Sequence, residues 1–163
     1  MKRYWYGIVI LFAVLLQGCG EAPKLKGESA MIVLKTPAMK YADMGFIYAT
    51  PSEVKAEIYG SGQALFTLRI TPQSVCTSRF ACLDRRSFNA RMLSANYPDD
   101  TLERIFRAKP LFNGKNVVKK RNGFTQKLLM PGKYNIEYTV FNNETVFRDT
   151  INQILIKIKR MRG

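Results

Sequence analysis

The sequence predicts a mainly β protein, a β-sandwich or a small barrel, and three observations lead to this interpretation. Short runs in which apolar and polar side chains alternate recur along the chain, as in 54–58 and 134–140, and a half-buried strand requires this alternation. Pro, Gly and Asn interrupt the runs at intervals of about eight to twelve residues. Only one central stretch shows helical spacing. We therefore expect about eight or nine strands in one domain.

The first half of the domain predicts a β-meander. Proline follows closely after several of the runs, for example Pro37 and Pro51, and proline ends strands because it cannot donate to the ladder. Gly60-Ser61-Gly62 supplies a turn between the last two runs. The expected strands are 31–35, 44–50, 54–58 and 64–70.

Residues from about 72 to 110 interrupt the β pattern, and we expect a short helical insertion there. Asp84 is placed to cap a first helix. Its apolar stripe would be Phe88, Met92 and Ala95, spaced i, i+4, i+7. The segment 98–100, Pro-Asp-Asp, has the composition of a second helix start. The expected buried face of that second helix is Leu102, Ile105 and Phe106.

The second half predicts further hairpins. Asn122-Gly123 between strands 116–121 and 124–129 indicates a type I′ turn, because both turn residues tolerate a positive φ. Pro131-Gly132 and Asn142-Asn143 indicate two more turns. Lys157 and Lys159 alternate with isoleucines on the last strand, where we expect them to guard a sheet edge against pairing. The remaining expected strands are 134–140, 145–150 and 154–159.

The first eighteen residues have the layout of an export signal. Lys2 and Arg3 precede an apolar run over 7–16, which ends at the small residue Gly18. This run is about half of the roughly 20 apolar residues that span a bilayer. We therefore expect an exported protein rather than one anchored by this segment as a membrane helix.

The residues that close this signal, Leu16-Gln17-Gly18-Cys19, resemble the lipobox of bacterial lipoproteins. The resemblance implies cleavage after Gly18, a diacylglyceryl thioether on Cys19 and usually a third acyl chain, such as palmitate, on the new amino terminus. It also implies a lipid-anchored protein of the outer membrane, facing the periplasm. The alternative is an ordinary secretory signal beside a chance cysteine. The expected organisation is a signal peptide over 1–18, a lipidated tether over 19–30 and one domain over 31–163.

Two cysteines remain after Cys19 is assigned to lipid. Cys76 and Cys82 form a matched pair in a chain expected to be exported, which favours a disulfide. Their spacing differs from Cys-x-x-Cys, and the chain has no His to complete a Cys/His zinc site. We expect a structural bridge that contributes about 2 kcal/mol.

A local resemblance refines the fold. Residues 128–140, in which Pro131-Gly132 leads into a strand that opens with Tyr134, resemble the penultimate-strand segment of immunoglobulin-like and transthyretin-like domains. The resemblance implies a β-sandwich of that kind, with the helical, disulfide-containing segment inserted between its β-rich halves.

The chain is strongly basic. Its formal net charge is +14, and removing Lys2 and Arg3 with the signal leaves +12. Such a charge favours contact with anionic lipid, lipopolysaccharide or cell-wall polymers, whereas the alternative is a merely solvated surface. We do not expect nucleic acid as a partner. The candidate anion-binding residues are Lys115, Lys119, Lys120 and Arg121 at the 122–123 hairpin, with Arg104 and Arg107 in the insertion.

The composition argues against an enzyme. Without His, a Ser-His-Asp or Cys-His catalytic apparatus is excluded. The densest acidic group, Asp99, Asp100 and Glu103, fits a helix start better than general acid–base catalysis. We expect no catalytic residue, metal site or cofactor. Two functions remain: a non-enzymatic module that binds or scaffolds an envelope protein, and a binder of anionic lipid or polymer through basic faces.

Overall fold

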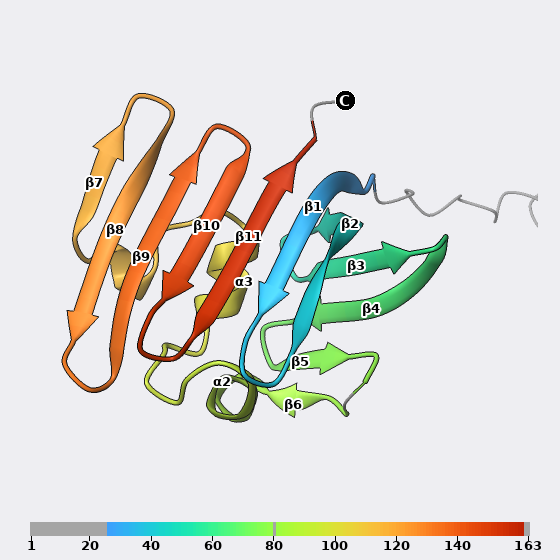
Figure 1. Cartoon of the computed structure of the whole chain (residues 1–163), viewed down its shortest axis with the longest axis horizontal. Coiled ribbons are helices and arrows are strands. Elements are labelled where there is room, and N and C mark those ends of the chain that lie inside the picture. Colours follow the sequence, from blue (N-terminus) through green and yellow to red (C-terminus); the bar gives the residue numbers. More distant parts are fainter. Residues whose placement is uncertain (1–25, 80, 162–163) are drawn as a thin grey trace, which may run out of the picture.

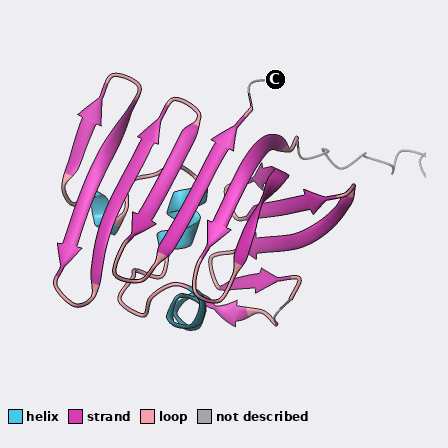
Figure 2. Ribbon diagram, in the orientation of Figure 1, coloured by secondary structure: helices cyan, strands magenta, loops and turns pink. Residues whose placement is uncertain are grey.

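The computed structural model describes residues 26–79 and 81–161, and it confirms a mainly β fold. Within these residues the strands form one antiparallel sheet in the order β6-β5-β4-β3-β2-β1-β11-β10-β9-β8-β7 (Figures 1 and 2). The strands are β1 (Glu28–Lys35), β2 (Lys40–Ala49), β3 (Val54–Gly60), β4 (Gln63–Ile70), β5 (Ser74–Thr77), β6 (Leu83–Asp84), β7 (Val117–Lys120), β8 (Gly123–Met130), β9 (Tyr134–Phe141), β10 (Glu144–Asp149) and β11 (Ile154–Arg160). The helices are α2 (Arg85–Met92), α3 (Thr101–Phe106) and the 3₁₀ turn η1 (Phe112–Gly114).

The sheet consists of two meanders that meet at its centre. The chain steps outward from β1 to β6, passes through the helices to β7 at the opposite edge, and steps back to β11. The last strand then pairs with the first, so that Ala30 lies opposite Arg160 and Lys35 lies opposite Leu155. The helical segment is therefore an insertion between two β-rich halves. Strand β1 begins at Glu28, earlier than the predicted domain start at residue 31.

One apolar core serves both halves of the sheet. The sheet bends beyond β1, and β3 and β4 run across the direction of β8–β11 (Figure 1). Buried side chains from both halves and from the two helices belong to a single cluster, including Phe66, Phe88, Phe106, Tyr138 and Phe147. This is a sandwich-like layout in which one continuous ladder supplies both halves. No helix of the described residues is long and apolar enough to cross a membrane.

The insertion combines helices with a small hairpin. Asp84 caps α2 as predicted, since its carboxylate accepts a hydrogen bond from the Ser87 amide at 2.9 Å. The prediction for Ala95 was wrong, because α2 ends at Met92 and Ala95 is exposed. Strands β5 and β6, which the sequence did not indicate, flank the confirmed disulfide between Cys76 and Cys82. The predicted buried face of α3 is confirmed: Leu102, Ile105 and Phe106.

The β7–β8 hairpin forms with a different turn from the one predicted. Lys120 pairs with Gly123, so the two turn residues are Arg121 and Asn122, and neither has a positive φ. Gly123 belongs to β8, where a Cβ atom would lie 1.9 Å from the Val140 carbonyl oxygen. The glycine is needed for close approach of two backbones rather than for a type I′ turn.

One further expectation about strand position was wrong. Strand β11, which carries Lys157 and Lys159, lies at the centre of the sheet between β1 and β10. The edges are β6 and β7, so the lysines on an edge strand are Lys119 and Lys120. Residues 128–140 form most of the β8–β9 hairpin, and β10 and β11 follow it, as predicted.

Candidate anion-binding site

Two turns lie at one end of the central strands, the β1–β2 turn and the β10–β11 turn. Thr36 is buried in the first, where its hydroxyl oxygen accepts hydrogen bonds from the amides of Ala38 and Met39, each at 3.1 Å. This side-chain bonding replaces ladder hydrogen bonds and fixes the turn locally. The turn therefore sets the positions of Lys35 and Lys40, the residues at the facing ends of β1 and β2.

Asp149 fixes the second turn. Its Oδ1 accepts hydrogen bonds from the amides of Asn135, Ile151 and Asn152, and its Oδ2 accepts from the Asn152 side chain and the Tyr97 hydroxyl. Burial would raise the pKa of Asp149, but these donors outweigh burial and hold it below its usual value. Burial, together with the hydrogen bond to Asp149, raises the pKa of the Tyr97 hydroxyl. Asp149 is thus a satisfied structural carboxylate.

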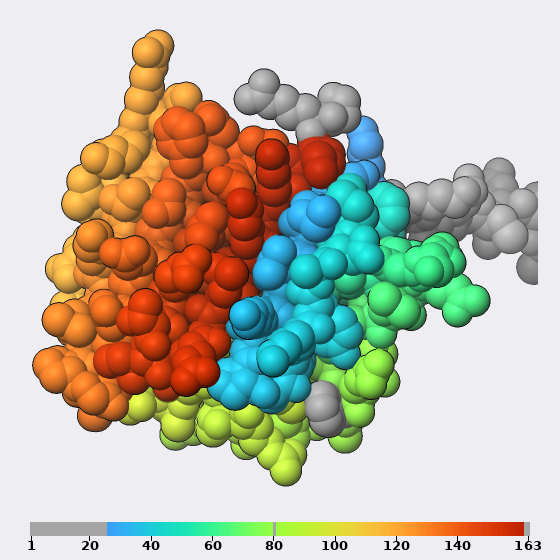
Figure 3. Space-filling model, in the orientation of Figure 1, coloured from blue at the N-terminus to red at the C-terminus, as the bar shows by residue number. Residues whose placement is uncertain are grey.

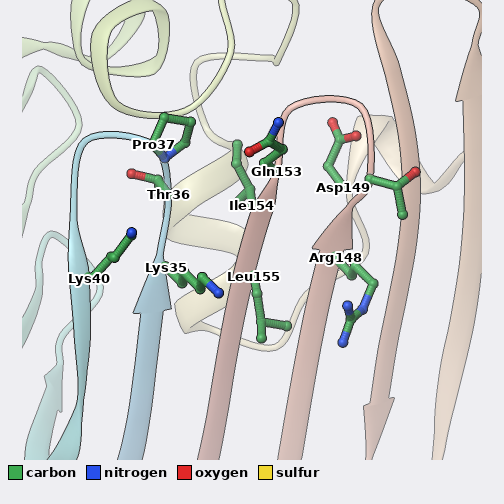
Figure 4. Close-up of a pocket in the computed structure, with 10 residues that line it drawn as sticks. Lys35, Thr36, Pro37, Lys40, Arg148, Asp149, Gln153, Ile154 and Leu155 are labelled. Carbon is green, nitrogen blue, oxygen red and sulfur yellow. The ribbon is translucent and has the colours of Figure 1, made fainter.

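A cavity of about 650 Å³ lies between the two turns, and three cations line it: Lys35, Lys40 and Arg148 (Figure 4). The register places all three in one row across the sheet. Lys40 lies opposite Lys35, Lys35 lies opposite Leu155, and Leu155 lies opposite Arg148. In Figure 4 the apolar Leu155 side chain lies between Lys35 and Arg148. Polar groups of the turns complete the rim: Thr36, Thr150 and Gln153.

These three cations have no acidic partner in the part of the chain that the structure describes. Among the described residues, none of them makes an ion pair. Glu137, the cross-strand neighbour of Arg148, pairs with Lys127 at 3.2 Å instead. The donors to Asp149 already satisfy that carboxylate, although it also lines the cavity. Like charges directly opposite on adjacent strands destabilise a sheet. The positive charge at this end therefore does not stabilise the fold.

Such an arrangement suits one class of ligand chemistry. An arginine fork can bind a phosphate or carboxylate with two parallel hydrogen bonds, and two lysines add point charges around it. The cavity volume lies within the range of small-molecule sites. Leu155 offers an apolar surface beside the charges. The geometry therefore favours a small anionic group attached to a larger body, such as a phosphorylated or carboxylated sugar.

The predicted candidates Arg104 and Arg107 serve the fold. Arg107 donates to Glu103 at 2.8 Å and to the Thr50 carbonyl oxygen at 2.7 Å, and its side chain is 15% exposed. Arg85 reaches the same carboxylate at 2.6 Å. Burial would raise the pKa of Glu103, but the two arginines outweigh it and the pKa is lowered. Arg104 pairs with Asp100 at 2.5 Å. The Thr50 contact attaches α3 to the first half of the sheet, the Arg85 contact attaches it to α2, and the other two ion pairs lie within α3 and its two cap residues.

The other candidates lie elsewhere. Lys119, Lys120 and Arg121 are exposed on edge strand β7 and its turn, and they make no ion pair with any described residue. Lys115 lines a smaller cavity of about 350 Å³ together with Lys127, whose charge is paired with Glu137. Figure 1 places the β7–β8 turn at the end of the sheet opposite the β1–β2 and β10–β11 turns. Cys19 lies outside the described residues.

The acidic group of Asp99, Asp100 and Glu103 has arginine partners within the helical insertion. Asp100 and Glu103 pair with arginines, and Asp99 lies 3.6 Å from Arg86. A second cavity of about 750 Å³ next to these residues mixes both signs of charge, including Asp84, Arg85 and Arg86. In the described ranges, no group of three or more Cys, Asp or Glu side chains is placed to hold a metal ion.

Sequence reasoning missed Lys35, Lys40 and Arg148. A signal existed for the first two, since two lysines flank Thr36-Pro37-Ala38-Met39, and a four-residue turn would place them face to face. Local sequence pattern could not identify Arg148 as a residue of this site. It reaches the site only because β11 pairs with both β1 and β10. Comparison of the chain with protein-family models and with curated proteins gave no match.

Proposed function

We propose that this chain is a lipoprotein anchored in the outer membrane and facing the periplasm, and that its domain is a non-enzymatic binding module. Its ligand is an envelope glycan or glycolipid that presents a phosphate or carboxylate. The cationic pocket of Lys35, Lys40 and Arg148 binds that anionic group.

The observation that carries the proposed ligand class is the set of three unpaired cations around one cavity. Lys35 and Lys40 are held face to face by a tight turn, and Arg148 is held by the strand beside Leu155. A fold that only needed solubility would not require like charges at directly opposed positions. An anion placed between them would remove the repulsion and gain charge-assisted hydrogen bonds.

The lipid anchor and the absence of catalysis rest on the sequence. The lipobox resemblance of Leu16-Gln17-Gly18-Cys19 supports attachment to a membrane. The lack of His in the whole chain supports a binding role over acid–base or nucleophilic catalysis at neutral pH. Glu103, a member of the densest acidic group, is ion-paired with Arg85 and Arg107 in the described structure.

The pocket is tested with a matched pair of sugars. A chain of residues 19–163 carrying Cys19→Ser contains the complete core and avoids lipid. It is labelled with ¹⁵N and titrated with glucose 1-phosphate or with glucose. We expect amide shifts in the two turns, 35–40 and 148–155, only with the phosphorylated sugar. The dissociation constant should be on the order of 1 mM, because a few partly solvated ionic contacts contribute a few kcal/mol.

Two triple variants with the same net charge separate the pocket from general basicity. Lys35→Gln, Lys40→Gln and Arg148→Gln together should abolish these shifts. Lys119→Gln, Lys120→Gln and Arg121→Gln together should leave them unchanged, since those residues lie at the other end of the sheet. Equal shifts with glucose, or equal weakening by both variants, would exclude the pocket and favour scaffolding of an envelope protein.

The anchor is tested separately in cells. Cys19→Ala should leave the protein unprocessed or soluble, because stable anchoring needs at least two acyl chains. Intact mass and detergent phase partitioning report this. A processed Cys19→Ala protein that still fractionates with membranes would contradict lipidation.

A further inference from the structure

Four chain segments meet at the end of the sheet opposite the cationic pocket: the start of β1, the end of β11, the β9–β10 turn and the β7–β8 turn (Figure 1). Backbone hydrogen bonds join them in sequence. The Met161 amide donates to Ser29 at 2.8 Å, the Arg160 amide donates to Asn143 at 2.9 Å, and the Asn142 amide donates to Asn122 at 2.9 Å. We call this the tether end, because residue 26, the first described residue, adjoins it.

Large apolar side chains are exposed beside this end on the outer face of the sheet, the face opposite the helices. Met31 lies opposite Met44 on β2 and opposite Lys159 on β11. The row continues across β10 and β9 to Phe141, and Phe141 is 50% exposed. Figure 3 shows this open face, formed by the strands. Its exposed apolar residues near the tether end are Met31, Met44, Phe46, Phe141 and Met161.

The same end has an excess of positive charge. Two acids at this end are already paired, Glu28 with Arg160 at 2.9 Å and Glu144 with Lys157 at 2.8 Å. Asp43, beside Met44, makes no ion pair among the described residues and accepts a hydrogen bond from the Met44 amide. Four cations at this end make no ion pair among the described residues: Lys119, Lys120, Arg121 and Lys159. Exposed apolar side chains bordered by unpaired cations are the composition of a surface that binds anionic lipid.

The attachment point of the linker favours one end of the sheet for contact with a bilayer. Cys19 and Lys26 are separated by seven peptide steps, and a random-coil linker of that length would have a root-mean-square span of about 15 Å. Strand β11 alone has seven residues and occupies about 23 Å between the tether end and the pocket end. With lipid on Cys19, the tether end therefore lies nearer the bilayer, and only a linker fully extended to about 25 Å would reach past the pocket end.

We propose that the tether end and the adjoining outer face dock on the surface of an anionic phospholipid bilayer. This inference rests on the proposed lipid anchor. Phe141, Met161 and the exposed methionines enter the headgroup region, and the four unpaired cations contact lipid phosphates. Docking orients the cationic pocket toward the periplasm, where an envelope glycan can reach it.

The test uses residues 19–163 with Cys19→Ser, so that no acyl chain contributes. Its partitioning is measured by co-sedimentation with vesicles of phosphatidylcholine alone or with 30% phosphatidylglycerol as the probe. We expect binding only to the anionic vesicles. Replacing Lys119, Lys120 and Arg121 by Gln should lower the partition coefficient about 100-fold, because each surface cation contributes about fivefold. Phe141→Ser should lower it about fivefold.

The pocket variant with Gln at positions 35, 40 and 148 is the control of equal charge, and it should bind vesicles like the wild type. Equal loss in both triple variants would overturn the docking surface, as would equal binding to neutral vesicles. A concentration-dependent dimer that Phe141→Ser disrupts would assign this face to a second copy of the chain instead. If the wild-type protein showed the amide shifts with glucose 1-phosphate but did not bind anionic vesicles, the docking inference would fail and the proposed pocket would stand.

Discussion

Lys35 and Lys40 occupy directly opposed positions on β1 and β2, with no acid paired to either within the described residues. Opposed like charges cost a sheet a few tenths of a kcal/mol to about 1 kcal/mol. Lys35→Gln should therefore raise the free energy of unfolding by about 0.5 kcal/mol while it weakens binding of glucose 1-phosphate. Urea unfolding at low salt measures the first effect, and the gain should shrink at 1 M NaCl because salt screens the repulsion.

Lys127→Gln is the matched control for this prediction. Lys127 is also an exposed lysine on a strand, but its charge is paired with Glu137 at 3.2 Å. Lys127→Gln should leave the free energy of unfolding unchanged or lower it slightly. If Lys35→Gln destabilised the protein as Lys127→Gln does, the two opposed lysines would not repel each other in the native state.

Local sequence pattern predicted most strands and some turns because those features depend on near neighbours. Alternation located β3 and β9, and the Asp84 cap follows from one side chain and the amide of Ser87, close in sequence. Gly132, with φ +71°, lies in the predicted β8–β9 turn. The disulfide was also predictable, since Cys76 and Cys82 remain as a matched pair once Cys19 is assigned to lipid in a chain expected to be exported.

Long-range pairing could not be predicted. Lys157 and Lys159 have the pattern of an edge strand, yet β11 is central because it pairs with β1, which lies at the other end of the sequence. The positions of the anion-binding candidates relative to one another could not be predicted for the same reason. Arg107 is directed to the Thr50 carbonyl oxygen by tertiary packing, and nothing near it in the sequence specifies that partner.

Asp149 provides a prediction with a defined pH dependence. Asp149→Asn keeps the shape but removes the charge that five donors stabilise, so it should lower the free energy of unfolding by about 2–4 kcal/mol at pH 7. The pKa of Asp149 is lowered in the folded state. Its stabilisation is therefore present above the unfolded value near 3.9 and is lost as pH falls through the folded pKa.

Urea unfolding at several pH values between 7 and 2.5 measures this difference. The gap between wild type and Asp149→Asn should be constant from pH 7 to about 5 and narrow below about 4. Tyr97→Phe, which removes one of the five donors, should cost about 1 kcal/mol at pH 7. A gap that stayed constant down to pH 2.5 would mean that the Asp149 charge contributes nothing to stability.

Gly123 connects backbone packing with the proposed lipid surface. A Cβ atom at this position would lie 1.9 Å from the Val140 carbonyl oxygen, and a backbone atom cannot move aside as a flexible side chain can. Gly123→Ala should therefore break the pairing of β8 with Phe141 and lower the free energy of unfolding by about 2 kcal/mol. Gly60→Ala is the control, because its Cβ would meet side-chain atoms rather than backbone: Leu65 Cδ1 at 2.4 Å, in an exposed side chain that can move aside, and Asp43 Oδ2 at 3.7 Å. Thermal unfolding compares the two variants.

Since Arg121 and Phe141 are held together through this pairing, Gly123→Ala should also weaken binding to anionic vesicles, whereas Gly60→Ala should not. Unaltered vesicle binding in a Gly123→Ala protein with a displaced hairpin would show that the two residues act on lipid independently.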